Sequence, residues 1–433
     1  MKNRKTKTLR IVLAVLLIVS TLMIAVACGE KAPDPTPTPS AAATPTPTAA
    51  NTPDETTDPA ASADPAQALL DAAEETKEGF LAMIADPGAV TIVELEALVL
   101  ARGLYEADPD RLDIPWDCPA YEAYSEILNN DEYVLPEYEE RQALVMKLLT
   151  HPSALVRSYC IGQMGSMFGR SDEHINAVAE LLTTDKDPVV IKAALYTFMN
   201  DLATNETLGK LALEEYAVSD DARIRAAVAY SLGSSWNKSL EGAVEAIIVL
   251  LGDSDQSVRN SAASGAGSNA DERLIEPLVA ILNNPDDTDT HGKSLSAIID
   301  MWYDYPFHEN FSEAAYNATL DYLRKTPRNN DMPTWTGVGD MKYFSTSNFG
   351  AWKEKATYFK PDELCAILIE IALDPDAHSF ARMNAVEVVA VHGTEANLNT
   401  IKAALDTIAE PTTGDTRAIE AVDKALAELT AVE

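Results

Sequence analysis

The sequence predicts an all-α solenoid of stacked antiparallel helix pairs, and three observations support this fold class. A Val-Arg or similar pair recurs every 34 residues, at Val156-Arg157, Val190-Ile191, Ile224-Arg225 and Val258-Arg259. Apolar residues around each pair recur at helical spacing. Glycine is scarce, with 19 among 433 residues, which disfavours a fold with many tight turns. A fixed period of this kind predicts structural units that stack on their neighbours.

Each unit is predicted to be a pair of helices. The first helix follows an acidic turn, such as DKDP, SDDA or GDSD, whose aspartates can cap free backbone N–H groups. A glycine such as Gly233 is expected to end this helix with a positive φ. The second helix is more apolar, and in one unit it carries Ala243, Val244, Ile247, Ile248 and Leu251. Since one pair cannot bury both of its faces, neighbouring pairs must stack.

The order of an acidic turn, Val-Arg, a small residue three positions later and then Leu-Gly resembles HEAT repeats, particularly the short kind of the phycobilin lyase-like group. The tetratricopeptide and ankyrin signature residues are missing. The resemblance implies a ladder in which the turn aspartate pairs with the arginine of an adjacent repeat. The second repeat departs, with Ile191 at the arginine position and Lys192 beside it. The residues that match this position, for which we expect a structural role, are Arg157, Arg225, Arg259 and Arg382.

The periodicity divides the rest of the chain. Residues 66–140 are predicted to be helical, degenerate first repeats, and residues 141–300 to be HEAT-like repeats. The pattern fails in residues 301–360, which are predicted to be irregular and rich in aromatic residues. It returns in residues 361–433, which are predicted to form C-terminal HEAT-like repeats and a charged cap.

The N-terminus has the layout of an export signal. Five basic residues precede an uncharged run from Ile11 to Ala27, slightly shorter than the ~20 residues that span a bilayer. A plain membrane anchor is the alternative interpretation. The sequence Ala25-Val26-Ala27-Cys28-Gly29 resembles the lipobox of bacterial lipoproteins, although Ala25 stands where that family usually has Leu. The resemblance implies a signal peptide over residues 1–27 and fatty acylation of Cys28 as a membrane anchor.

Residues 28–65 are predicted to be a disordered linker after the lipidated cysteine. The run PTPTPSAAATPTPT fixes φ at alternate positions and removes hydrogen-bond donors, which favours an extended spacer. A Thr-Pro spacer after such a cysteine resembles Gram-positive surface lipoproteins. The sequence therefore predicts an exported protein that is lipid-anchored on the extracytoplasmic face of the cell membrane.

Aromatic residues concentrate where the periodicity fails, with 14 of the chain's 29 between Met301 and Phe359. One interpretation is a recognition segment for a sugar, peptide or protein. The other is a distorted repeat whose aromatic residues fill a local core. The candidate binding surface consists of Trp302, Tyr303, Tyr305, Trp335, Tyr343, Trp352 and Tyr358.

Composition and motifs disfavour several functions. The formal charge of −35 repels phosphate backbones, so we expect no nucleic-acid partner. No catalytic motif is present, and no cofactor or metal is predicted. The cluster of Asp286, Asp287, Asp289 and His291 is interpreted as a solvated acidic turn rather than a cation site. Among Cys118, Cys160 and Cys365, the last two are expected to be buried, and a single disulfide remains open.

These observations favour a non-enzymatic interaction scaffold. The chain is expected to hold to a membrane through its N-terminal lipid and to bind a protein or peptide partner. The alternative is an enzyme, or a cofactor- or carbohydrate-handling protein, with its site in residues 301–360.

Overall fold

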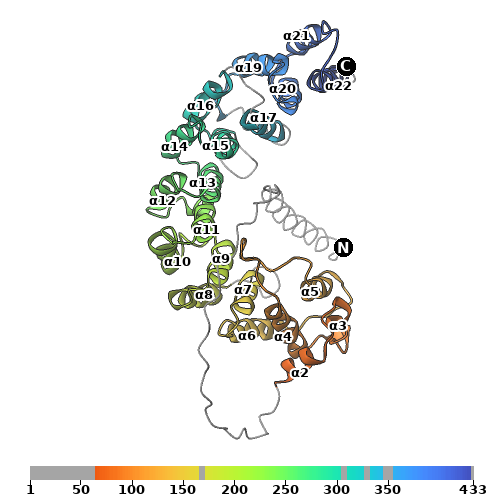
Figure 1. Cartoon of the computed structure of the whole chain (residues 1–433), viewed down its shortest axis with the longest axis vertical. Coiled ribbons are helices and arrows are strands. Elements are labelled where there is room, and N and C mark those ends of the chain that lie inside the picture. The colour runs from red at the N-terminus through yellow and green to blue at the C-terminus, as the bar shows by residue number, and fades with distance from the viewer. Residues whose placement is uncertain (1–63, 165–170, 304–309, 326–331, 345–354, 431–433) are drawn as a thin grey trace, which may run out of the picture. The chain divides into compact units, whose positions relative to one another are not determined.

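The computed structural model describes residues 64–164, 171–303, 310–325, 332–344 and 355–430, all of which belong to one compact unit, Ser62–Glu433. These residues form an all-α solenoid, which confirms the predicted fold class (Figure 1). The proposed signal peptide, Cys28 and nearly all of the linker lie outside the described residues. The first helices are α2 (Pro65–Ala72), α3 (Lys77–Leu81), α4 (Ile92–Ala101) and α5 (Pro119–Asn129).

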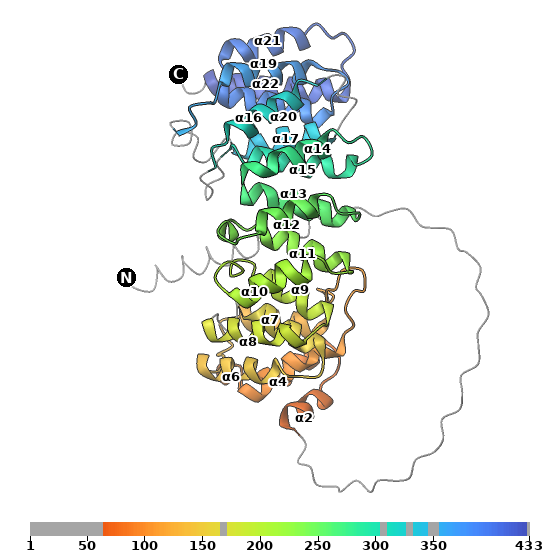
Figure 2. The ribbon, with the colours of Figure 1, turned by 90° about the vertical axis from the view of Figure 1, so that its left-hand side faces the viewer.

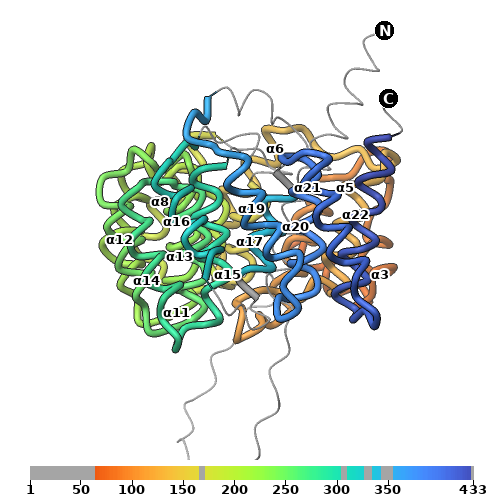
Figure 3. Tube along the Cα trace, turned by 90° about the horizontal axis from the view of Figure 1, so that it is seen from above, coloured from red at the N-terminus to blue at the C-terminus, as the bar shows by residue number. Residues whose placement is uncertain are grey.

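The remaining helices form two layers (Figures 1 and 2). The first layer contains α6 (Tyr138–Leu148), α8 (Asp172–Thr184), α10 (Glu206–Leu211), α12 (Ala243–Leu251), α14 (Ile275–Leu282), α16 (Glu313–Leu323), α19 (Pro361–Leu373) and α21 (Glu395–Leu405). The second layer contains α7 (Ala154–Gln163), α9 (Pro188–Thr197), α11 (Ala222–Leu232), α13 (Gln256–Asn269), α15 (Thr288–Asp300), α17 (Met332–Phe344), α20 (Ser379–His392) and α22 (Thr413–Thr430). Each second-layer helix packs on the next one along the stack, which Figure 3 views from above.

The acidic turns cap the second-layer helices as predicted. The side chains of Asp187, Asp221 and Asp255 each accept a hydrogen bond from the backbone N–H two residues later, at 3.0, 2.9 and 2.8 Å. Each aspartate precedes the first residue of its helix and satisfies a donor that the helix cannot pair internally. The turn sequence therefore determines where these helices begin.

The prediction that glycines end these helices with a positive φ is wrong. Gly233 follows α11 with φ −69°, and Gly267 lies inside α13. Their role is close packing: a Cβ on Gly233 would lie 2.0 Å from Cα of Gly265, and one on Gly267 would lie 2.9 Å from Cα of Ala297. The missing side chains let neighbouring second-layer helices approach backbone to backbone.

A continuous apolar core runs between the two layers from α6–α7 to α21–α22. Helices α2–α5 surround a second, smaller core that includes Phe80, Leu98 and Ile127. The assignment of residues 66–140 as degenerate first repeats stays a prediction. Cys118, Cys160 and Cys365 are buried free thiols, so they form no disulfide with one another. Among the helices of the described ranges, none combines the length and hydropathy needed to cross a membrane.

The prediction that residues 301–360 are irregular is wrong for much of the segment. It contains α16 in the first layer and α17 in the second, where α17 packs on α15 and α20. Gly337 allows the close approach to α15, because a Cβ there would lie 2.5 Å from Cδ2 of Leu295. The segment therefore holds a helix pair, as the alternative of a distorted repeat predicted.

Candidate interaction surface

Arginines of the second layer link one repeat to the next. Arg225 on α11 bonds Asp253 before α13, with Nε 2.7 Å from Oδ2 and Nη2 2.8 Å from Oδ1. Its Nη1 also donates to the carbonyl of Ser219, 2.7 Å away. These contacts hold the pKa of Asp253 below its ordinary value, because Arg225 stabilises the ionised carboxylate. Equivalent pairs are Arg157 with Asp185 and Arg259 with Asp287.

The ladder is interrupted at the second repeat, where both partners are missing together. Ile191 stands at the arginine position, and Ser219 stands 34 residues after Asp185, at the aspartate position. Lys192 instead donates to Oδ1 of Asp113, 2.9 Å away, in the segment before α5. The contact between repeats is thus replaced by one from the N-terminal part of the chain.

Arg382 forms the most buried contact of this kind. Its side chain is 1% exposed, that of Asp415 is 6% exposed, and Nη2 lies 2.6 Å from Oδ1. Its Nε donates to the carbonyl of Ala372, 3.0 Å away. One guanidinium therefore joins α19, α20 and the start of α22, which is a structural role.

Two of the predicted binding aromatics lie in the core. Trp302 is 0% exposed and Tyr303 is 2% exposed. The indole Nε1 of Trp302 donates to Oγ1 of Thr319, 2.8 Å away, and Tyr358 donates its hydroxyl to the carbonyl of Trp302 at 2.6 Å. Tyr316 packs edge-on against the indole, with ring centroids 5.0 Å apart. The binding-surface prediction is wrong for Trp302 and Tyr303, because their rings fill a local core.

Trp335 belongs to a different aromatic cluster from Trp302. Trp335 on α17 is half-buried and stacks on His378 with ring centroids 4.8 Å apart, close to Phe380 at 5.6 Å. Tyr343 lies in α17, but its side chain is outside the described residues. Tyr305 and Trp352 also lie outside them. The structure therefore brings Trp302, Tyr303 and Tyr358 together and places Trp335 in a second cluster.

Two tyrosines of the second layer form another aromatic contact. Tyr196 on α9 and Tyr230 on α11 have ring centroids 5.7 Å apart, and Tyr230 is 39% exposed. Tyr230 lies roughly 200° around the helix from the buried Val228. The same position of α7 is Gly162, which is exposed and has no atom within 4 Å of an added Cβ. Tyr196 and Tyr230 therefore lie on the side of α9 and α11 opposite Ala194 and Val228, which are buried.

Sequence reasoning missed this tyrosine pair, although its signal is present. Tyr196 and Tyr230 stand 34 residues apart, each five positions after the arginine position of its repeat. A residue at that position falls on the face opposite the buried stripe. Searching the period for exposed aromatic residues, rather than searching for where the period fails, would have found the pair.

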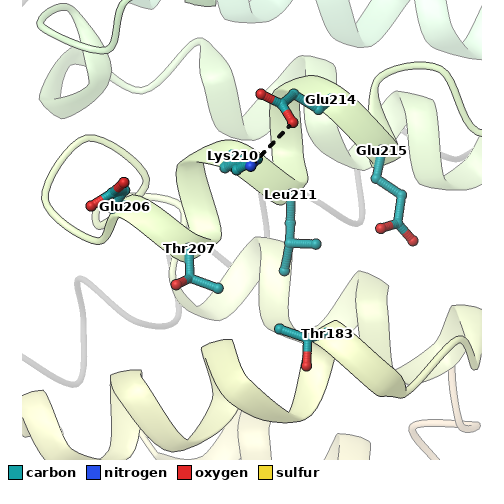
Figure 4. Close-up of a pocket in the computed structure, with 7 residues that line it drawn as sticks. All are labelled: Thr183, Glu206, Thr207, Lys210, Leu211, Glu214 and Glu215. Carbon is teal, nitrogen blue, oxygen red and sulfur yellow. Dashed lines mark ion pairs between the residues drawn. The ribbon is translucent and has the colours of Figure 1, made fainter.

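A hollow lies on the first layer between α8 and α10. It has a volume of about 440 Å³ and is open to solvent. Figure 4 shows Lys210 beside Glu214, and their charged atoms are 3.7 Å apart. In Figure 4 the carboxylates of Glu206, Glu214 and Glu215 point in different directions rather than toward one another. Its lining residues are Thr183, Glu206, Thr207, Lys210, Leu211, Glu214 and Glu215.

Two carboxyl groups of the second layer have perturbed ionisation. Burial, together with the smaller effect of the nearby Asp340, raises the pKa of Asp300 on α15 to about 8. Burial also raises the pKa of Asp340 on α17 to about 6, although Ser296 donates a hydrogen bond to it. Asp300 is therefore mostly protonated near neutral pH.

The acidic turn around residue 287 belongs to the ladder. Asp287 accepts hydrogen bonds from Arg259 and from the hydroxyl of Thr290, 2.8 Å away. Across the described ranges, no group of three or more His, Cys, Asp or Glu side chains is arranged to hold a metal ion.

Comparison with known proteins supports the repeat assignment. A family model described as HEAT repeats matches residues 206–298, which correspond to α10 through most of α15. The chain thus carries HEAT repeats over this range. No curated protein matches the chain. The crystal structure of an engineered protein is similar at 17% identity and a TM-score of 0.40, covering 84% of this chain and 97% of that one.

Proposed function

We propose that this protein is a lipid-anchored, extracytoplasmic HEAT-repeat scaffold that binds a protein partner on the face of its second layer that carries Tyr196 and Tyr230. The tyrosine pair formed by Tyr196 and Tyr230 carries this proposal. Repeat solenoids use extended faces to bind other proteins, and HEAT repeats often mediate such interactions. Exposed tyrosines are enriched at protein interfaces because they bury a large area at a small entropic cost.

Charge indicates what kind of partner suits this face. The chain carries 68 acidic and 33 basic residues, so its long-range field attracts a basic protein. We therefore expect a partner that places apolar side chains on the tyrosine pair and basic side chains around it. Its association should slow as salt concentration rises, because the steering field is screened.

The partner surface is tested with two variants of the lipidated full-length protein. Tyr196→Ala with Tyr230→Ala removes the pair, whereas Tyr138→Ala removes a tyrosine of similar exposure, 42%, on the first layer. Partners co-purified from solubilised membranes are quantified against the parent protein. The proposal expects one partner to fall about tenfold or more in the double variant and to stay at the parental level in Tyr138→Ala. Equal recovery of every partner from both variants contradicts it.

The tether rests on the lipobox-like sequence ending in Cys28 and on the Thr-Pro linker that follows it. Metabolic labelling with a fatty-acid analogue tests it in cells of a lipoprotein-processing bacterium. Cys28→Ala should abolish labelling, and the three buried thiols remain in this variant as an internal control. Labelling that persists in Cys28→Ala contradicts the anchor.

The sequence also left open an enzyme or carbohydrate-handling function in residues 301–360. No described feature of that segment favours it, because Trp302 and Tyr303 belong to the core. Solenoids of this kind generally act as scaffolds, and the fold by itself assigns no chemistry.

A further inference from the structure

A shallow hollow on α5 combines an exposed aromatic platform with a row of polar side chains. Its volume is about 350 Å³. Trp116 is 56% exposed, and its ring meets that of Tyr121 at 89° with centroids 5.5 Å apart. The hollow is lined by Lys77, Trp116, Tyr121, Glu122, Ser125, Glu126 and Asn129.

The aromatic platform is anchored from the protein side. Arg102 is only 6% exposed, and its guanidinium carbon lies 5.1 Å from the centroid of the Tyr121 ring. The same guanidinium donates to Sγ of the buried Cys118, which immediately precedes α5. These contacts fix Tyr121 and the start of α5, so the exposed indole of Trp116 rests on a rigid support.

The polar side chains form one stripe of α5. Glu122, Ser125, Glu126 and Asn129 are spaced three or four residues apart and therefore share a face of the helix. Nζ of Lys77 lies 3.3 Å from Oε2 of Glu126 and orients that carboxylate. Together, the stripe and Lys77 present carboxylate acceptors, an ammonium donor, and hydroxyl and amide groups that can both donate and accept.

A pyranose ring matches this combination of surfaces. One side of such a ring is a row of C–H groups, whose positive edge packs on the electron-rich face of an indole, while its hydroxyl groups extend sideways as donors and acceptors. The hollow is of a size that small-molecule sites share. An amphipathic peptide helix fits less well, because five of the seven lining side chains are polar.

Charge narrows the class of sugar. Glu122 and Glu126 outnumber Lys77, so the hollow is net negative and disfavours uronic acids, sialic acids and phosphorylated glycans. We propose that Trp116 and the polar stripe of α5 bind an uncharged pyranose residue of a glycan. This site is separate from the tyrosine pair, and its test does not depend on the protein partner proposed above.

Titration of the purified full-length protein with chitotetraose, cellotetraose and maltotetraose tests the site, with binding followed by calorimetry and tryptophan fluorescence. One of these sugars should bind saturably. Trp116→Ala should weaken that binding about tenfold or more, and Glu126→Gln should weaken it severalfold. Trp236→Ala is the matched control, since Trp236 is 71% exposed but lies outside the hollow, and it should bind as the parent does.

Three outcomes overturn the site. One is the absence of saturable binding by all three sugars. Another is unchanged affinity in Trp116→Ala. The third is binding of a tetraproline peptide that depends on Trp116 while no sugar binds, which would assign the hollow to a peptide instead. Circular dichroism of each variant confirms that the helices are intact before affinities are compared.

Discussion

The buried ion pair of Arg382 and Asp415 should be a large single contributor to the stability of the C-terminal repeats. Arg382→Met keeps the length of the side chain but removes the donors to Asp415 and to the carbonyl of Ala372. Removing one partner of a buried pair typically costs 3–5 kcal/mol. Asp415 still accepts hydrogen bonds from the N–H and hydroxyl of Thr412, at 2.8 and 2.7 Å. The expected loss is therefore about 3 kcal/mol, the lower end of that range.

Equilibrium urea unfolding measures this loss, and amide exchange of α22 locates it. The control is Arg273→Met, which removes two surface ion pairs, with Glu245 and with Asp271, and should unfold as the parent does. Adding Asp415→Asn completes a double-mutant cycle, in which a coupling above about 1 kcal/mol is expected. A loss below about 1 kcal/mol for Arg382→Met, or no coupling, would refute the assigned role of this pair.

Three further predictions concern the packing of helices at Gly233, the ionisation of Asp300 and the arginine–aspartate ladder. Gly233→Ala should destabilise the chain by about 1–3 kcal/mol, because the added Cβ would clash with the backbone of Gly265. The control is Gly162→Ala, whose added Cβ contacts no atom and which should be neutral or stabilising. Equal melting temperatures of the two variants would contradict this. Folding raises the pKa of Asp300 to about 8 and that of Asp340 to about 6. The folded chain therefore holds these protons more tightly than the unfolded chain does, so its stability is highest at acidic pH and falls as the pH rises through these values. Asp300→Asn should therefore flatten the fall in stability between about pH 4 and pH 8, and an unchanged pH profile argues against it. Ile191→Arg combined with Ser219→Asp should restore the missing ladder contact. The double variant should then be more stable than the summed stability changes of the two single variants predict. Additive stability changes would contradict the ladder geometry.

Much of the repeat architecture could be predicted from the sequence, because a helix pair that buries one stripe must repeat its apolar positions at a fixed interval. Capping aspartates such as Asp221 are local features, and they hold in the structure. The interruption at Ile191 is visible in the sequence, but its cause is not local. Only the structure pairs that position with Ser219 and replaces the contact by Lys192 with Asp113.

The incorrect predictions for the aromatic segment and for the glycines share a physical cause. Sequence composition does not show which face of a helix a residue occupies or which neighbour it contacts. A concentration of aromatic residues is compatible with a surface or a core, and Trp302 proves buried because Thr319 satisfies its indole N–H. The pair of α16 and α17 was obscured because α17 begins at Met332, 44 residues after the start of α15 at Thr288, which departs from the 34-residue period. The role of Gly233 depends on a neighbour 32 residues later, Gly265, which the helix-ending rule does not consider.

The central claim is that the face of the second layer around Tyr196 and Tyr230 binds a protein partner at the membrane surface. A photoactivatable phenylalanine analogue, placed at Tyr230 or at Tyr138 of the full-length protein in its host membrane, tests this claim directly. The account predicts a discrete protein adduct from position 230 that position 138 does not form. An absence of adduct at position 230, or the same adducts from both positions, would contradict it.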